Sequence, residues 1–190
     1  MIFPIVAYGH PVLRKVAAPL QPGELLLESF IADMWETMYA SNGVGLAAPQ
    51  VNKSIRLFTV DTLQIFEGMS ADEQKNYPDA PGLKAVFINA QIVSLAGTPW
   101  AYNEGCLSIP KVREDVLRPA TVELEYLDEH WQPQRNVFSG LTARVILHEY
   151  DHIEGKLFID HLSGLKKKLL KGKLADITKG HVKVDYKMQF

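Results

Sequence analysis

Residues 148–152 (HEYDH) constrain the fold of this chain more than any other segment. On an α-helix, residues four apart lie on one face, so the imidazoles of His148 and His152 can reach a single metal ion. Glu149 lies between them, where it can take a proton from a metal-bound water without binding the ion itself. The pattern therefore predicts a metal-dependent hydrolase whose fold brings a third ligand to this helix face. The alternative is a helix whose two histidines are ordinary surface or core residues.

The residues before and after this segment favour the helix that a metal site requires. Apolar residues precede it at helical spacing, Ser139 is a suitable N-cap, and Gly155 supplies a C-terminal stop. Asp151 is placed to support the geometry of a histidine ligand by hydrogen bonding. We therefore expect a helix between Ser139 and Gly155 with the metal on one face.

The composition excludes several classes of protein. The chain has 190 residues, of which 47% are hydrophobic and 22% charged, and we expect residues 1–190 to form a single soluble domain. A formal net charge of −2 creates no field that would attract nucleic acid or a membrane, and no apolar run is long enough to span a bilayer. Residues 1–6 lack the basic start of a secretion signal, and the single cysteine fits a reducing compartment, so we expect a cytoplasmic protein.

The remaining patterns predict an α+β fold, because strands and helices do not alternate as β-α-β units. Helical spacing is present in residues 24–40, and a basic helix is expected over about 162–175. The expected strands cover residues 54–61, 85–90, 121–127 and a return strand that ends near residue 138.

Cys106 is the residue that best completes a metal site. A lone cysteine is usually a small buried hydrophobe, but two histidines need a third protein ligand and an open position for water. Gly105 precedes the thiol and allows close approach of the backbone, which favours Cys106. Glu154, His161 or a more distant acid are alternative third ligands. A role of Cys106 as a redox sensor is a weaker alternative.

Residues 43–50 (GVGLAAPQ) superficially match the glycine pattern of dinucleotide-binding loops. That pattern requires a strand before it and a helix after it, whereas here a helical segment precedes it and Pro49 lies inside the turn. No nucleotide cofactor is therefore expected. We interpret the segment as a backbone wall that a ligand can approach closely, with the carboxamide of Gln50 as a hydrogen-bond donor.

Two sets of charges have two interpretations each. Glu104 and Arg118 are either a structural or substrate-orienting pair or two solvated charges. A run of lysines near the C-terminus is either a solvated helix face or a contact for RNA or the ribosome. These lysines are Lys166, Lys167, Lys168, Lys171 and Lys173.

Three segments together resemble the signature motifs of the peptide deformylase family. They are residues 43–50 (GVGLAAPQ), 104–108 (EGCLS) and 148–152 (HEYDH), and residues 8–14 (YGHPVLR) resemble the family's N-terminal segment. The similarity covers about residues 1–165. It implies a monomeric α+β enzyme with small antiparallel or mixed sheets packed around a central metal-bearing helix. Such an enzyme removes the formyl group from the N-terminal methionine of nascent chains.

The resemblance also implies a role for each motif residue. Cys106, His148 and His152 bind one divalent metal, with Fe²⁺ as the first choice and Ni²⁺ or Zn²⁺ as alternatives. Glu149 is the general acid and base. Glu104 with Arg118 matches a charge pair of the family, which favours the paired interpretation.

For the substrate, the resemblance implies that Gln50 and the backbone N–H of Leu107 stabilise the oxyanion. Residues near the methionine side chain or along the peptide groove are Val44, Gly45, Glu104, Gly105, Leu141, Arg144 and Val145. A tight wall at Gly45 would reject acetylated ends, because an acetyl group carries a methyl where a formyl group has only hydrogen.

The chain also departs from the family pattern. Leu147 stands where many members have glutamine, and residues 65–84, which are rich in Asp, Glu, Pro and Gly, are expected to form a long solvated loop. The basic C-terminal helix resembles an extension with which some members dock at the ribosome. Two rival functions are a zinc peptidase that cleaves internal peptide bonds and a catalytically silent relative that binds the ribosome.

Overall fold

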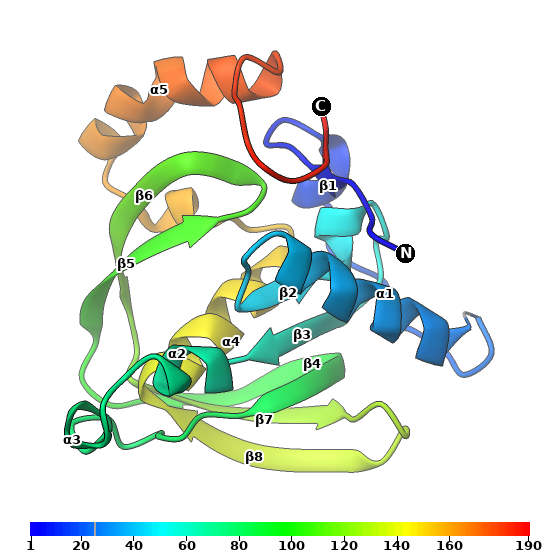
Figure 1. Cartoon of the computed structure of the whole chain (residues 1–190), viewed down its shortest axis with the longest axis vertical. Coiled ribbons are helices and arrows are strands. Elements are labelled where there is room, and N and C mark those ends of the chain that lie inside the picture. The colour runs from blue at the N-terminus through cyan, green and yellow to red at the C-terminus, as the bar shows by residue number, and fades with distance from the viewer. Residues whose placement is uncertain (25) are drawn as a thin grey trace.

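The computed structural model describes residues 1–24 and 26–190 and has the predicted α+β architecture. The helices are α1 (Leu27–Ala40), α2 (Leu63–Glu67), α3 (Ala71–Gln74), α4 (Gly140–Ile153) and α5 (Gly164–Thr178). The strands are β1 (Ile5–Val6), β2 (Gly45–Ala47), β3 (Leu57–Asp61), β4 (Lys84–Ala96), β5 (Trp100–Cys106), β6 (Ile109–Arg118), β7 (Thr121–Leu127), β8 (Pro133–Ser139) and β9 (Met188–Gln189). Figure 1 shows α4 near the middle of the molecule, between the larger sheet and the β5–β6 hairpin.

The strands form one larger sheet and two small ones. Strands β2, β3, β4, β7 and β8 are hydrogen-bonded in that order, and each neighbouring pair is antiparallel. Strands β5 and β6 form a separate antiparallel hairpin, whereas β1 pairs in parallel with β9 and joins the two ends of the chain. The predicted hairpin is confirmed as β7 and β8, and both predicted strands before it are present as β3 and β4. The β5–β6 hairpin and the short strands β1, β2 and β9 were not predicted.

Helix α4 is buried on two faces, and its sequence explains both. Ala143, Ile146 and Leu147 recur at helical spacing and pack against apolar side chains of β3, β4 and β7. A fully buried apolar side chain contributes about 1.5–3 kcal/mol relative to an exposed one, so this stripe fixes the rotation of the helix. His148 and His152 then lie on the side of α4 that meets the β5–β6 hairpin.

The start of α4 differs from the prediction in one respect. Ser139 is the N-cap residue, but its side chain makes no capping hydrogen bond. Instead, Asp79 Oδ2 accepts a hydrogen bond of 2.7 Å from the backbone N–H of Thr142. Gly140 has a φ of +58°, and a Cβ there would collide with the Asp79 carboxyl group. The helix N-terminus is therefore capped by the segment before β4 rather than by its own N-cap side chain.

The segment at residues 65–84 is more structured than a solvated loop. It contains the end of α2 and all of α3, and it closes with the Asp79 contact to α4. The side chain of Ser70 caps α3 by accepting from Glu73 N, which is a local signal that the sequence carries. The expected solvated loop is therefore wrong for residues 65–67 and 71–74, which are helical, although most of the segment is exposed or half-buried.

The other long helices pack in different apolar clusters, α1 with β3 and β4 and α5 with β6. Helix α1 begins at Leu27 rather than at residue 24, and the predicted position Leu25 lies outside the described residues. Helix α5 buries Leu170, Leu174 and Ile177 against the cluster that includes β6, and it is longer than predicted. Among the described residues, no helix has both the length and the apolar character needed to cross a membrane.

Candidate active site

Cys106, His148 and His152 meet at one point, and their ligand atoms all lie within 4.8 Å of one another. Cys106 Sγ is 3.3 Å from His152 Nε2. The register of the β5–β6 hairpin shifts between Gly105 and Cys106, and such bulges re-aim a side chain. A thiol and two imidazoles with room for a fourth ligand suit divalent Fe, Ni or Zn, so the donor set fits the predicted metal.

The alternative third ligands are used elsewhere. Glu154 accepts a hydrogen bond of 2.7 Å from Arg56, and His161 lies 2.7 Å from Asp151. Neither belongs to the cluster of three.

Glu104 holds His148 in place. Its Oε2 lies 2.9 Å from His148 Nδ1, while its carboxylate also accepts hydrogen bonds from Arg118 and Arg144. Burial raises the pKa of Glu104, but the contacts with His148 and Arg118 outweigh burial and lower it, so the carboxylate stays ionised. Burial lowers the pKa of His148, but its hydrogen bonds with Cys106 and Glu104 raise it overall. A metal binding here would therefore displace a proton from this imidazole.

The predicted pair of Glu104 and Arg118 is present and buried, with Nε and Oε1 2.7 Å apart. Asp151 extends this network by accepting a hydrogen bond of 2.7 Å from Arg118 Nη1. The sequence interpretation placed Asp151 beside a histidine ligand, but it supports His148 only through Arg118 and Glu104. His152 Nδ1 is buried without a hydrogen-bond partner among the described residues.

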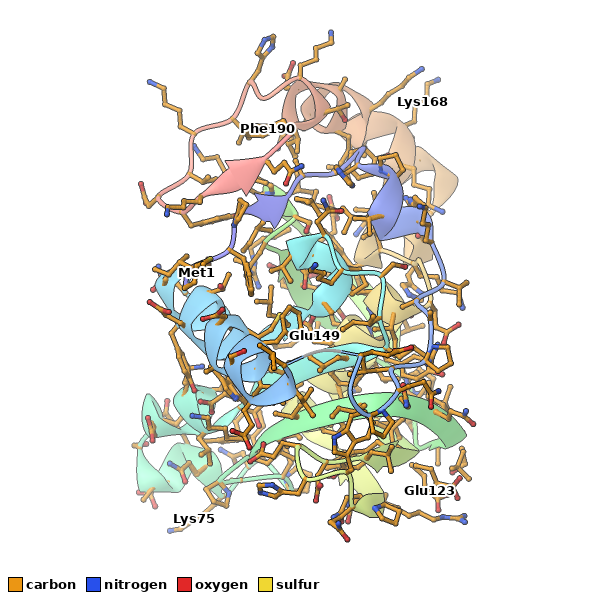
Figure 2. All side chains as sticks on the ribbon, turned by 90° about the vertical axis from the view of Figure 1, so that its right-hand side faces the viewer. Met1, Lys75, Glu123, Glu149, Lys168 and Phe190 are labelled. Carbon is orange, nitrogen blue, oxygen red and sulfur yellow. The ribbon has the colours of Figure 1, made fainter. Side chains whose placement is uncertain are left out.

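Glu149 is buried in the same region, with 4% of its surface exposed. Its Oε2 has no hydrogen-bond partner among the described residues, and burial raises its pKa to about 7. Figure 2 shows Glu149 in the interior, whereas Lys168 lies at the outer edge of the molecule. A carboxyl group with a pKa near neutrality, without a fixed partner, is suited to accept and return a proton.

Gly45 determines where Glu149 can lie. A Cβ at Gly45 would be 2.5 Å from Glu149 Oε1, so the absent side chain of Gly45 makes room for the carboxyl group. Gly45 was predicted to be a wall that faces substrate. The geometry adds a second requirement, because any side chain here would displace Glu149.

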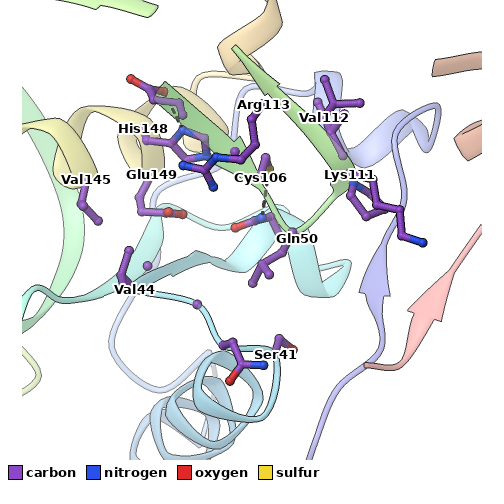
Figure 3. Close-up of a pocket in the computed structure, with 18 of the residues that line it drawn as sticks. Ser41, Val44, Gln50, Cys106, Lys111, Val112, Arg113, Val145, His148 and Glu149 are labelled. Atoms are coloured by element: carbon purple, nitrogen blue, oxygen red, sulfur yellow. Dashed lines mark hydrogen bonds and ion pairs between the residues drawn. The ribbon is translucent and has the colours of Figure 1, made fainter. Parts of the chain in front are cut away.

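Gln50 is fixed with its amide group toward Cys106. The 3₁₀ turn Ala48–Val51 lets Gln50 Oε1 accept a hydrogen bond of 2.8 Å from Ala47 N. Its Nε2 then lies 3.6 Å from Cys106 Sγ and 3.4 Å from Ser108 Oγ. Figure 3 shows the Gln50 side chain beside Cys106, with Glu149 close to Val44 and His148. Gln50 therefore presents N–H groups, not its carbonyl, to the site.

These residues line one pocket of about 730 Å³. All seven residues predicted to contact substrate line it, as do Gln50, Cys106, Leu107, His148 and Glu149. The guanidinium of Arg144 is turned inward, where it donates to Glu104 and to the carbonyl of Trp100. Its charge is therefore neutralised within the protein.

Several residues that line the pocket were not predicted from the sequence, and the following are among them. These residues belong to α2, to the β5–β6 hairpin and to the C-terminal segment: Ile65, Tyr102, Asn103, Lys111, Arg113, Lys183, Val184, Asp185 and Tyr186. None of them lies in a motif, so no local signal marked them. Arg113 bends over Gly105, where a Cβ would be 2.8 Å from its Nη1.

The arrangement of these residues defines a class of site. The three ligands leave room for a fourth at the metal, and a buried base and an amide donor line the same pocket as two of them. That combination is typical of metal-dependent hydrolases.

Comparison with known proteins agrees with this class. A family model described as polypeptide deformylase matches residues 2–168. The peptide deformylase of Flavobacterium johnsoniae is 54% identical over 192 residues and that of Christiangramia forsetii 52% over 190, each covering 100% of this chain and 96% of the relative. A crystal structure of a peptide deformylase from Legionella pneumophila is 35% identical, covers 95% of this chain and 98% of its own, and has a TM-score of 0.78.

The chain belongs to the polypeptide deformylase family. It is thus a hydrolase that removes the N-formyl group from newly made polypeptides, and its family is metal-dependent. The comparisons give no support to the rival peptidase or to a silent ribosome-binding relative.

Proposed function

We propose that Glu149 moves the proton when this pocket hydrolyses the formyl group of an N-terminal formyl-methionine. The observation that carries the proposal is the buried Glu149 carboxyl, whose Oε2 has no hydrogen-bond partner among the described residues and whose pKa is raised to about 7. Near neutral pH, such a group takes a proton from the attacking water and returns it to the departing α-amine.

Cys106, His148 and His152 would hold one divalent metal, with Fe²⁺ as the native ion and Ni²⁺ or Zn²⁺ as substitutes. When bound, the metal supplies Lewis-acid chemistry that makes a water molecule acidic enough to react near neutrality. Glu104 orients His148 through Nδ1, which supports Nε2 as the ligand atom. Arg118 hydrogen-bonds to Glu104 and Asp151 accepts from Arg118, so both residues help to hold Glu104 in place.

Gln50 and Leu107 would stabilise the negative charge that develops on the formyl oxygen. The Gln50 amide is already turned toward Cys106 by its bond to Ala47, so little reorganisation is needed during the reaction. A fixed donor of this kind typically contributes about 3 kcal/mol to the transition state. The backbone N–H of Leu107 is proposed as the second donor.

The residues that line the pocket suggest separate contacts for the methionine side chain and for the peptide backbone of the substrate. Val44, Leu141 and Val145 are apolar and suit a methionine side chain. Gly45, Glu104 and Gly105 line the pocket around the ligands and suit the peptide backbone. Arg144 lies beside the methionine site but acts through its ion pair with Glu104. The wall at Gly45 excludes an acetyl methyl group.

Formate release from formyl-methionine peptides tests these roles. We expect Glu149→Ala to keep its metal and lose turnover, and Cys106→Ser to lose metal, after anaerobic purification with metal analysis. The matched control is Glu125→Ala, because this carboxylate lies on β7 and forms its ion pair with exposed Arg135. Full deformylation by Glu149→Ala would refute the assigned base, and normal metal content in Cys106→Ser would refute the ligand set.

We also propose that α5 contacts the ribosome. Leu165 and Leu169 are exposed on this helix among the lysines, a combination suited to a surface of anionic RNA and protein. Replacing Lys167, Lys168 and Lys171 with glutamate should reduce sedimentation with ribosomes without changing turnover on short peptides. We also propose a monomer that acts in the cytoplasm, where newly made polypeptides are its substrates.

A further inference from the structure

The C-terminal segment Lys183–Tyr186 lines the same pocket as the motif residues. It lies beyond the family match, which ends at residue 168. After α5, the chain turns at Gly180, where φ is +74°, and returns to pair β9 with β1. Figure 1 shows this segment descending from α5 to the side of β1. The segment is therefore anchored at both ends, with its middle at the pocket.

Tyr186 joins this segment to a motif residue. Its hydroxyl donates a hydrogen bond of 2.7 Å to the backbone carbonyl of Leu107. Its ring is partly buried in the same apolar cluster as the Leu107 side chain. Burial, with a smaller contribution from Cys106, raises the pKa of Tyr186, so the phenol keeps its proton and acts as a donor.

Tyr186 hydrogen-bonds to the carbonyl of Leu107, while other contacts hold Ser108 and the side chain of Leu107. Ser108 is held on both sides, because its carbonyl accepts from Tyr8 N at 2.8 Å and its hydroxyl lies 3.4 Å from Gln50 Nε2. The Leu107 side chain lies against Gly43, where a Cβ would be 3.0 Å away. Fixing the Leu107 carbonyl restricts rotation about the Leu107 backbone and so restricts the direction of its N–H.

We propose that Tyr186 is a positioning residue for the reaction, which holds the Leu107 carbonyl so that the Leu107 N–H points at the developing oxyanion. The inference rests on the proposed function, in which Leu107 is an oxyanion donor. Tyr186 acts through Leu107 and not by contact with the substrate. The competing explanation is that its hydroxyl only anchors the C-terminal segment.

The test compares Tyr186→Phe with Tyr126→Phe. Tyr126 is also a partly buried phenol with one side-chain hydrogen bond, from Asn136 at 3.1 Å, but it lies on β7 away from the pocket lining. We expect Tyr186→Phe to lower kcat about five- to tenfold with KM within about twofold, because a looser donor weakens transition-state binding more than ground-state binding. Metal content and Tm should match those of Tyr126→Phe, which keeps wild-type kcat.

A wild-type kcat in Tyr186→Phe would overturn the inference. So would a fall in kcat that is matched by a fall in Tm or in bound metal, because the hydroxyl would then be only an anchor. A wild-type enzyme that releases no formate would instead refute the proposed function itself.

Discussion

The two sides of the pocket are built in different ways. One side carries the motif residues on α4 and the β5–β6 hairpin, and buried ion pairs join them through Glu104. The other side includes Ile65 of α2 and the C-terminal segment, whose Tyr186 donates one hydrogen bond to the backbone carbonyl of Leu107. Metal binding and catalysis require particular residue types at fixed spacing, whereas a pocket lining requires only side chains of suitable shape. The first side therefore leaves a motif in the sequence, and the second does not.

The largest effect is expected on the motif side, from Glu104→Ala. Removing this carboxylate leaves the guanidinium groups of Arg118 and Arg144 buried without their shared partner. Breaking a buried ion pair in this way typically costs about 3–5 kcal/mol of stability. Urea unfolding should show that loss, and metal analysis should show less bound metal because His148 is no longer oriented.

The exposed pair of Glu125 and Arg135 is the control for this change. Glu125→Ala should leave the unfolding midpoint nearly unchanged, because solvent screens exposed charges. If Glu104→Ala were as mild as Glu125→Ala, the buried network would not be what holds the motif side together.

The pH dependence of stability gives the next effect, again on the motif side. Burial raises the pKa of Glu149 to about 7 from an ordinary value of 4.5, so the folded protein binds this proton more tightly than the unfolded chain. Stability should therefore fall as pH rises from about 4.5 to 7, by about 3 kcal/mol at about 1.4 kcal/mol per pKa unit. Thermal unfolding of the metal-stripped protein at pH 5 and pH 8 measures this.

Glu149→Gln removes the titrating group while keeping the shape of the side chain. The variant should match the wild type near pH 5 and be the more stable protein near pH 8. If the stability of both proteins had the same pH dependence, the pKa of Glu149 would not be raised, and the argument for Glu149 as the base would fail.

A smaller effect is expected outside the motifs, from Asp79→Ala, because Asp79 caps α4 and is not among the residues that line the pocket. This change removes the acceptor for Thr142 N and leaves the N-terminus of α4 without its side-chain cap. Loss of a cap costs about 1 kcal/mol, and bound metal should be retained. Ser139→Ala is the matched control, because the Ser139 side chain makes no capping bond. A larger effect of Ser139→Ala than of Asp79→Ala in urea unfolding would reverse the assignment of the cap.

The same contrast explains what the sequence could and could not predict. His148 and His152 were placed by helical spacing, and β7 and β8 by alternation and an intervening turn. The cap from Asp79 and the contact from Tyr186 join residues 63 and 79 positions apart, which no local pattern records. The two-residue strands β1 and β9 are likewise too short to carry alternation.

The role of Asp151 shows how a local pattern can mislead. Its place next to His152 suggested direct support of a ligand, but its carboxylate bonds to Arg118 and His161. Adjacent helical residues point in different directions, so chain neighbours need not share a function. The β5–β6 hairpin was missed although it carries Glu104 and Cys106, because its motif was interpreted for chemistry and not for strand alternation.

Anomalous X-ray diffraction from crystals of the anaerobically prepared, metal-loaded enzyme tests the central claim most directly. One metal peak should lie within about 2.0–2.4 Å of Cys106 Sγ and of one ring nitrogen each of His148 and His152, with Glu149 outside the coordination sphere. A peak bound by Glu149, or one that lacks the Cys106 thiolate, would contradict the ligand set and the role of Glu149 together.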